Sequence, residues 1–276
     1  MDIIASVSAL RERLQREPNN VFVPTMGNLH EGHIDLIRIG KPKAACTVVS
    51  IFVNRLQFGP KEDFERYPRT FQTDCDKLRS AGVDVVFAPD EKEIYPEPQT
   101  FVVEPSDLQH ILDGAFRPGH FRGVATVVLK LFNMVMPHAA IFGKKDYQQY
   151  LVLRDMVRQL ALPVEIIPAE TVRAADGLAL SSRNGYLSAT ERAEAPRLYA
   201  LLREAQERIT KGERNFQRIE LESMALLAQN GWVPQYVSVR RRADLQTPAP
   251  EERELVVLAA AYLGKTRLID NIEVTL

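Results

Sequence analysis

The chain has 276 residues, of which 45% are hydrophobic and 26% charged, and its formal net charge is −1. This length suits one large domain or two smaller ones, and the hydrophobic fraction can fill a core. The small net charge argues against a nucleic-acid-binding protein, which normally carries a basic face. No apolar stretch is long enough to cross a membrane, and the first residues do not look like a signal peptide. The sequence therefore predicts a cytoplasmic protein that binds neither nucleic acid nor membrane.

The two cysteines, Cys46 and Cys75, lie in no Cys-x-x-Cys pattern and near no Cys/His cluster. This pattern favours buried, reduced thiols over a disulfide framework or a structural zinc site.

Up to about residue 180, strands alternate with helices. Charges at helical spacing predict an amphipathic helix in residues 1–17. Apolar runs predict strands at 21–23, 47–54, 83–90, 101–105, 138–143 and 164–172, and helical spacing predicts helices from about residue 30 and at 70–81, 124–135 and 146–160. Gly82 is a predicted C-cap. This alternation is typical of an α/β fold, a Rossmann-like doubly wound parallel sheet.

After Gly185 the pattern changes. Residues 188–211 and 215–229 predict two charged helices, and 236–240, 254–263 and 267–274 predict strands. This pattern indicates a smaller α+β unit with an antiparallel sheet. We predict a Rossmann-like domain over residues 1–180 that holds the ligand site, and a C-terminal domain over 181–276 that closes over this site.

Residues 21–40 contain the most informative pattern of the chain. A buried strand at 21–23 is predicted to end at Pro24, and Gly27 allows a tight turn. His30 and His33 then stand three residues apart in the first turn of a helix. A helix N-terminus offers unpaired N–H groups to an anion, and two imidazoles beside it favour a polyphosphate. A single histidine here would more often be a surface or capping residue, but the pair after a glycine turn favours the phosphate site.

This His-x-Gly-His spacing resembles the nucleotide signature of the adenylyl-transferring Rossmann superfamily, which includes class I aminoacyl-tRNA synthetases. The narrower resemblance is to the pantoate–β-alanine ligase (pantothenate synthetase) family. It is carried by PTMGNLHEGH, SIFVN-x-x-QF, YPRT, RPGHFRGV, FGKKDYQQ and DGLALSSRNGYL, which occur in that order. The resemblance implies an AMP-forming ligase that makes a C–N bond. It would join (R)-pantoate to β-alanine through a pantoyl-adenylate, in pantothenate and coenzyme A biosynthesis, and would release AMP and pyrophosphate.

The resemblance also implies ATP as a substrate, Mg²⁺ held mainly through the ATP phosphates with no protein residue assigned to it, and a homodimer. It assigns catalytic roles to His30, His33, Lys145 and Arg183. It assigns Gln57 and Gln149 to pantoate and β-alanine. It assigns ATP to Met26, Gly27, Asn28, Leu29, His30, Glu31, Gly32, His33, Gly143, Lys144, Lys145, Asp146, Val172, Leu180, Ser181, Ser182 and Arg183.

Physical roles can be argued for several of these side chains. Attack of a carboxylate on the α-phosphorus builds charge on phosphoryl oxygens, so catalysis is mostly positioning and charge neutralisation. We expect His30 and His33 to hold a proton against the bound phosphates. The hydroxyls of Ser181 and Ser182 and the Arg183 guanidinium suit the β- and γ-phosphates. A plain turn at 184–185 is the alternative, and the histidine pair earlier in the chain favours the phosphate role over it. The Lys145 ammonium is suited to bind a phosphate, and the Asp146 carboxylate is suited to bind the ribose hydroxyls. Charged residues of this kind are also common at the solvent-exposed start of a helix.

Some features stay open. In RPGHFRGV, Arg117, His120 and Arg122 either line the substrate pocket or are structural. Arg55 and Lys144 depart from the proline and glutamate usual in the family, and Pro42 should end the first helix early.

Two rival functions also remain. One is a nucleotidyltransferase of the same superfamily that acts on a phosphorylated small molecule. The other is a nucleotide-sensing module without turnover.

Overall fold

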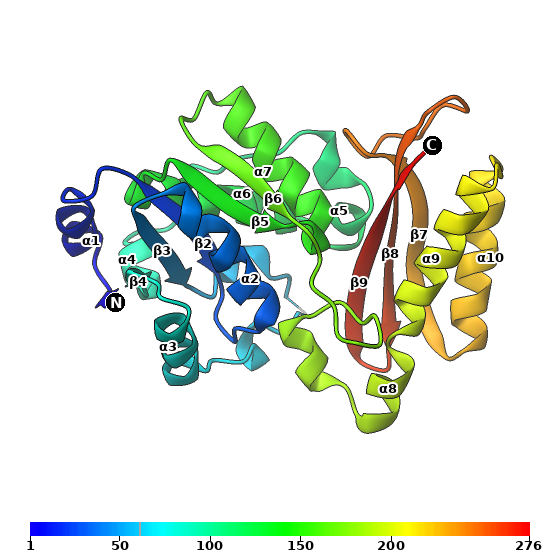
Figure 1. The fold of residues 1–276 in the computed structure, drawn as a ribbon, viewed down its shortest axis with the longest axis horizontal. Helices are drawn as coiled ribbons and strands as arrows, with labels where there is room; N and C mark the ends of the chain where they lie inside the picture. The colour runs from blue at the N-terminus through cyan, green and yellow to red at the C-terminus, as the bar shows by residue number, and fades with distance from the viewer. Residues whose placement is uncertain (61) are drawn as a thin grey trace. The chain divides into compact units, whose positions relative to one another are not determined.

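The computed structural model describes residues 1–60 and 62–276 (Figure 1). Their contacts define two compact units, one of Met1–Lys144 with Gln149–Glu170 and the other of Lys145–Gln148 with Thr171–Leu276. The domain boundary at residue 180 stays a prediction. Among the residues described, no helix is both long and apolar enough to cross a membrane.

The first unit is built on a six-stranded sheet in the order β1-β4-β3-β2-β5-β6, and every recorded pairing is parallel. Its strands are β1 Asp2–Ile4, β2 Asn20–Thr25, β3 Cys46–Ile51, β4 Val85–Phe87, β5 Ala139–Gly143 and β6 Glu165–Ala169. Its helices are α1 Val7–Leu14, α2 Glu31–Gly40, α3 Phe71–Ser80, α4 Glu91–Ile94, α5 Asp113–Phe116 and α6 His120–Val135, and α7 Tyr147–Gln159 begins in the second unit.

Alternating side chains of β2 cover both faces of this sheet, as the period of a strand requires. Val21 and Val23 share one buried cluster with apolar side chains of α2 and α3. Phe22 points to the other face, where its ring meets Phe132 of α6 edge-on with centroids 6.4 Å apart. Helices on both faces of a parallel sheet confirm the predicted doubly wound class.

The strand order reverses at β2. β3 and β4 follow on one side of β2, whereas β5 and β6 follow on the other. Ligands of open α/β sheets bind outside the carboxyl ends of the strands at such a switch point. The turn after β2 therefore lies at the position where this fold class binds its ligands.

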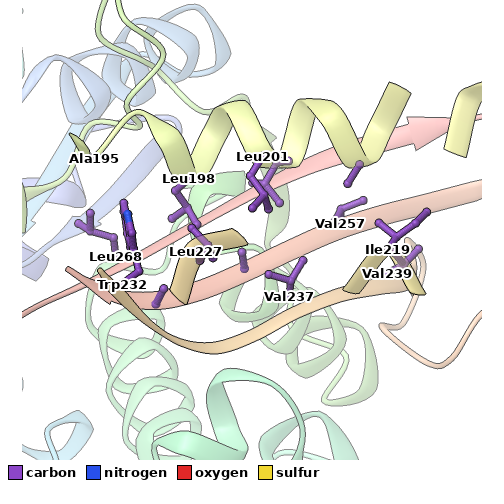
Figure 2. Close-up of a cluster of buried hydrophobic side chains, with 14 of the residues drawn as sticks. Ala195, Leu198, Leu201, Ile219, Leu227, Trp232, Val237, Val239, Val257 and Leu268 are labelled. Atoms are coloured by element: carbon purple, nitrogen blue, oxygen red, sulfur yellow. The ribbon is translucent and has the colours of Figure 1, made fainter. Parts of the chain in front are cut away.

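The second unit has an antiparallel sheet, β7 Trp232–Arg241, β8 Glu254–Leu263 and β9 Thr266–Thr275, with α8 Ala189–Glu194, α9 Arg197–Thr210 and α10 Phe216–Gln229. Figure 1 shows α9 and α10 side by side along this sheet. Between them lies an apolar core, in which Leu198 and Leu201 of α9 meet Val237 and Val257 of the sheet (Figure 2). This unit confirms the predicted α+β architecture.

Two predictions at the start of the chain were wrong. The segment 1–17 is not one helix, because Asp2–Ile4 form β1 and pair with Val85–Phe87 of β4. Pro24 does not end β2, which stays paired to β3 as far as Thr25 and Ile51. The Thr25 carbonyl accepts from Phe52 on the β3 side. Pro24 therefore faces the β5 side, where pairing stops at Phe22, and its missing N–H costs no ladder hydrogen bond.

Two later predictions also need correction. Residues 101–105 form no strand; Phe101 is 89% exposed, and the Val103 N–H donates to the Thr126 hydroxyl of α6. The helix expected at 188–211 is divided into α8 and α9, with Pro196 at the junction. Proline fits the start of the second helix because it has no N–H to bond to the preceding turn. As predicted, α2 ends just before Pro42, and Gly82 follows α3 with φ +70°.

Candidate active site

The turn between β2 and α2 brings the two predicted histidines together. Gly27 and Asn28 have φ of +78° and +49°, and they reverse the chain before the helix begins. His30 is the N-cap of α2, and its Nδ1 accepts from the Gly32 N–H at 3.2 Å. The His33 Nδ1 accepts from the His30 N–H at 3.3 Å. The two rings lie with their centroids 4.1 Å apart, so both line the first turn of the helix.

This reciprocal capping box determines the proton positions on both rings. A ring nitrogen that accepts an N–H carries no proton, so each neutral ring holds its proton on Nε2. A second proton on either ring would have to bind Nδ1 and would break a capping bond. The N-terminus of α2 thus combines its partial positive charge with two neutral N–H donors.

A buried carboxylate of α3 fixes the backbone of this turn. Asp74 is 1% exposed, and its two oxygens accept from the N–H groups of Asn28 and Leu29, each at 2.8 Å. The Thr70 hydroxyl lies 3.1 Å from the same carboxylate, and the Lys77 ammonium donates to the Leu29 carbonyl at 2.5 Å. α3 therefore holds the residues that lead directly into His30.

Gln57 lies in a short 3₁₀ helix, Arg55–Gln57, that follows β3, and its side chain contacts the same turn. Its Nε2 donates to the Met26 sulfur at 3.3 Å, and its Oε1 accepts from Asn54 Nδ2 at 3.0 Å. The Asn54 Oδ1 in turn accepts from the Tyr95 hydroxyl at 2.8 Å. Burial raises the pKa of Tyr95 above its usual value, so this hydroxyl stays protonated and keeps donating.

A chain of polar groups reaches the backbone of Gln57 from α6. Glu62 binds the Arg117 guanidinium through both oxygens, at 2.6 and 2.8 Å. Arg117 Nη1 lies 2.8 Å from His120 Nε2, and His120 Nδ1 lies 2.8 Å from the Gln57 carbonyl. Burial, together with the charge of Arg117, lowers the pKa of His120 to about 4. Burial works to raise the pKa of Glu62, but Arg117 outweighs it and the net shift is downward.

In the second unit, a tight hairpin brings Val172 and Leu180 opposite each other, with the Leu180 N–H donating to the Val172 carbonyl at 3.0 Å. Gly177 closes the hairpin with φ +95°, and a Cβ there would lie 2.8 Å from the Tyr199 ring. The chain then enters a 3₁₀ helix, Ser182–Tyr186, capped by the Ser181 hydroxyl, which accepts from the Arg183 N–H at 3.3 Å.

Lys145 and Asp146 belong to the same unit as this hairpin. The Lys145 carbonyl accepts from Asn271 of β9 at 3.0 Å, and the Tyr147 hydroxyl donates to Glu273 at 2.8 Å. The Lys145 ammonium lies 3.7 Å from the Asp146 carboxylate. The predicted phosphate- and ribose-binding residues of 145–146 and 181–183 therefore share one compact unit.

The remaining predicted residues lie in the first unit. Gly143 ends β5, Lys144 binds Glu170 at 2.5 Å, and Gln149 is half-buried in the first turn of α7. Lys144 and Arg55 are the two residues that depart from the family pattern. The partner of Lys144, Glu170, is the residue that follows β6. Arg55 lies 4.1 Å over the Phe64 ring and pairs with Glu65 and Glu91 at 3.4 and 3.6 Å.

Sequence reasoning missed the supporting residues Asp74, Lys77 and Tyr95, and it gave no role to Asn54 and Thr70, which lie in the motifs SIFVN-x-x-QF and YPRT. One signal could have revealed Asp74, because it occupies a buried position of α3 together with Cys75 and Leu78. A carboxylate in an otherwise apolar stripe needs strong partners. As predicted, both cysteines are free and buried.

Within the described part of the chain, no group of three or more His, Cys, Asp or Glu side chains is arranged to hold a metal ion. Mg²⁺ is commonly bound by substrate phosphates and water with only one or two carboxylates.

Comparison with known proteins gives a consistent result. Residues 2–273 match the family model described as pantoate-beta-alanine ligase. The chain is 56% identical to a pantothenate synthetase of Nitrosospira multiformis over 275 residues, which is 100% of this chain and 99% of that protein. It superposes with a TM-score of 0.95 on a pantothenate synthetase from Thermus thermophilus, at 43% identity and full coverage of both chains. A Francisella tularensis pantoate-beta-alanine ligase complexed with β-γ ATP and β-alanine matches with a TM-score of 0.83 and 35% identity, covering 99% of this chain and 97% of that one.

Proposed function

This chain belongs to the pantoate-beta-alanine ligase family, and from that premise we propose that it is an enzyme that joins pantoate to β-alanine with ATP. In the first step a pantoate carboxylate oxygen attacks the α-phosphorus, and the bond to the β-phosphate oxygen breaks to release pyrophosphate. In the second, the β-alanine amine attacks the acyl carbon, loses a proton and displaces AMP.

One observation carries the proposal for the first step. The Gln57 side chain touches Met26 in the turn that leads to His30 and His33. A side chain suited to an acid substrate therefore lies beside a turn suited to phosphates. The Met26 sulfur is a weak acceptor, so a substrate oxygen can replace it as the partner of the Gln57 amide. The Gln57 amide and the Met26 thioether are both neutral. The amide can therefore hold the pantoate carboxylate without an ion pair, which would lower the nucleophilicity of that carboxylate.

His30 and His33 act in this proposal as neutral donors. Their Nδ1 atoms cap α2, and in this proposal their Nε2–H groups bond the phosphoryl oxygens on which charge develops. This assignment replaces the expectation that both rings hold a second proton. Lys145, Arg183, Ser181 and Ser182 of the second unit bind the outer phosphates, and Asp146 binds the ribose hydroxyls.

Mg²⁺, when bound with ATP, would neutralise phosphate charge, and we assign it no protein ligand of its own. The Francisella tularensis ligase, whose structure is a complex with β-γ ATP and β-alanine, supports the same two substrates here. A C-terminal domain that closes over the site, a homodimer and a cytoplasmic location complete the proposal. Equilibrium sedimentation tests the dimer.

The decisive experiment measures exchange of labelled pyrophosphate into ATP before any β-alanine is added. The proposal predicts exchange that requires pantoate and continues without the amine, because the adenylate forms first. Exchange that starts only with β-alanine would show a concerted route. Exchange without pantoate, or a dinucleotide product from a phosphorylated substrate, would indicate the rival nucleotidyltransferase.

A further inference from the structure

The short 3₁₀ helix that carries Gln57, Arg55–Gln57, is fixed from one side by three polar residues, Glu62, Arg117 and His120, which we call the clamp. None of the three is assigned to a substrate above. The clamp begins at a carboxylate, passes through a guanidinium and an imidazole, and ends on the Gln57 main-chain carbonyl. Each link is 2.6–2.8 Å long, and His120 is 9% exposed.

The chemistry of the clamp selects one form of His120. A guanidinium has donors and no acceptor, so the contact between Arg117 and His120 requires an unprotonated Nε2. The proton of the neutral ring then sits on Nδ1, which donates to the Gln57 carbonyl. Glu62 holds Arg117 by a bidentate pair, and such pairs fix geometry as well as energy. This tautomer is the opposite of the one that the capping box gives to His30 and His33.

The backbone of α6 also lies so close to the 3₁₀ helix Arg55–Gln57 that position 123 has no room for a side chain. A Cβ on Gly123 would lie 2.2 Å from the Leu56 carbonyl oxygen and 2.7 Å from Gln57 Cα. The Gly123 carbonyl accepts from Asn54 Nδ2 at 3.2 Å, and the same Nδ2 donates to Gln57 Oε1 at 3.0 Å. The main chain and the side chain of Gln57 are thus both fixed from α6 and the end of β3.

We propose that His120, held as its Nδ1–H tautomer by Arg117 and Glu62, is a positioning residue that aims the Gln57 amide at the acid substrate. The inference rests on the proposed function, in which Gln57 binds pantoate. His120 touches no substrate in this scheme. Its effect reaches the reaction through the Gln57 backbone, so it should act on pantoate and not on ATP.

The test compares His120→Leu with His120→Asn in pantoate-dependent pyrophosphate exchange. The asparagine amide can occupy the place of Nδ1 and still donate to the Gln57 carbonyl, whereas leucine cannot. We expect His120→Leu to lower kcat/KM for pantoate by about tenfold, the effect of one lost hydrogen bond, and to leave KM for ATP within about twofold. His120→Asn should restore most of that loss. His110→Asn, at an exposed histidine, is the matched control and should behave as wild type.

A second measurement needs neither substrate nor activity. In protein labelled with ¹⁵N-histidine, the His120 resonances, assigned by their loss in His120→Asn, should show a proton on Nδ1 and none on Nε2 at pH 7. In Arg117→Met this preference should weaken but not reverse, because the donor to Nε2 is gone while the Gln57 carbonyl still accepts from Nδ1. A proton on Nε2 in the wild type would overturn the proposal, as would an equal loss for ATP and pantoate in His120→Leu. Absence of pantoate-dependent exchange in the wild type would instead refute the proposed function.

Discussion

Asp74→Asn tests whether α3 sets the geometry of the turn between β2 and α2. In the wild type, each carboxylate oxygen accepts a different backbone N–H, those of Asn28 and Leu29, both at 2.8 Å. An asparagine has the same shape but only one oxygen, so its NH₂ group must face one of the two N–H donors. One bond to a charged group is lost and a donor is left without an acceptor in a buried place.

These losses can be given a size. A hydrogen bond to a charged group contributes about 1.5–3 kcal/mol, and a stranded buried donor costs about 1–3 kcal/mol. The two figures describe overlapping parts of the same loss, so we expect Asp74→Asn to destabilise the first unit by about 2–4 kcal/mol and to lower its melting temperature by roughly 5–15 °C. Because a displacement of about 1 Å in a positioned group can cost 10²-fold, pantoate-dependent exchange should fall by about that factor.

The assay combines thermal unfolding with exchange kinetics measured well below the melting temperature of the variant, so that the folded protein is compared in both cases. Asp76→Asn is the control, since Asp76 lies on the same helix with its side chain 60% exposed and paired only to Arg79 among the ion pairs of the described residues. It should change stability by less than about 0.5 kcal/mol. If both variants melt and react like the wild type, the buried carboxylate does not hold the turn.

Three further predictions concern the side chains of the site. His30→Asn should keep the N-cap and the melting temperature but strongly reduce adenylation, whereas His30→Ala should also cost about 1 kcal/mol of stability; equal exchange rates in His30→Asn and wild type would contradict the Nε2–H role. Gln57→Glu should impair pantoate-dependent pyrophosphate release more than Gln57→Ala, because it sets a charge beside the carboxylate nucleophile; equal losses at unchanged ATP affinity would refute this. The pKa of His120 falls from 6.5 to about 4 on folding, so unfolded chains bind its proton first and the wild type should lose about 2 kcal/mol more stability than His120→Asn between pH 7 and pH 5 in urea titrations. Glu62 does not obscure this window, because its pKa is lowered from 4.5, and equal losses in the two proteins would show that His120 is protonated normally.

The fold was predictable where a single local signal determines an element. The apolar runs of β3 and β5, and the glycine after α3, gave the correct elements because burial on both faces and left-handed φ leave few alternatives. β1 was missed because its three residues are too few for a period, and their partner, β4, is distant in the chain. The strand predicted at 101–105 failed for a related reason, because Phe101 and Val102 are exposed and no described strand pairs with this segment.

The candidate site was predictable only where residues close together in the sequence build it. The turn and the histidine pair follow from one short motif, because neighbouring residues build them. The support from Asp74 joins residues 45 and 46 positions apart, and the contact of His120 with Gln57 joins residues 63 apart. No local pattern encodes such a distance. These contacts become visible only when α3 and α6 have been packed on the sheet.

The proton positions show why the distant contacts matter for chemistry. His30, His33 and His120 are the same residue type, yet the backbone N–H groups near the first two require an unprotonated Nδ1, whereas Arg117 requires an unprotonated Nε2 in the third. Sequence reasoning assigned a second proton to the first two because it weighed only the phosphate charge against the helix dipole. A second proton on either ring would also break a capping hydrogen bond. This cost is separate from the effects of the phosphate charge and the helix dipole. In the proposed mechanism, the neutral Nε2–H groups of the two rings that cap α2 would bond the phosphoryl oxygens on which charge develops when pantoate attacks, without a second proton on either ring.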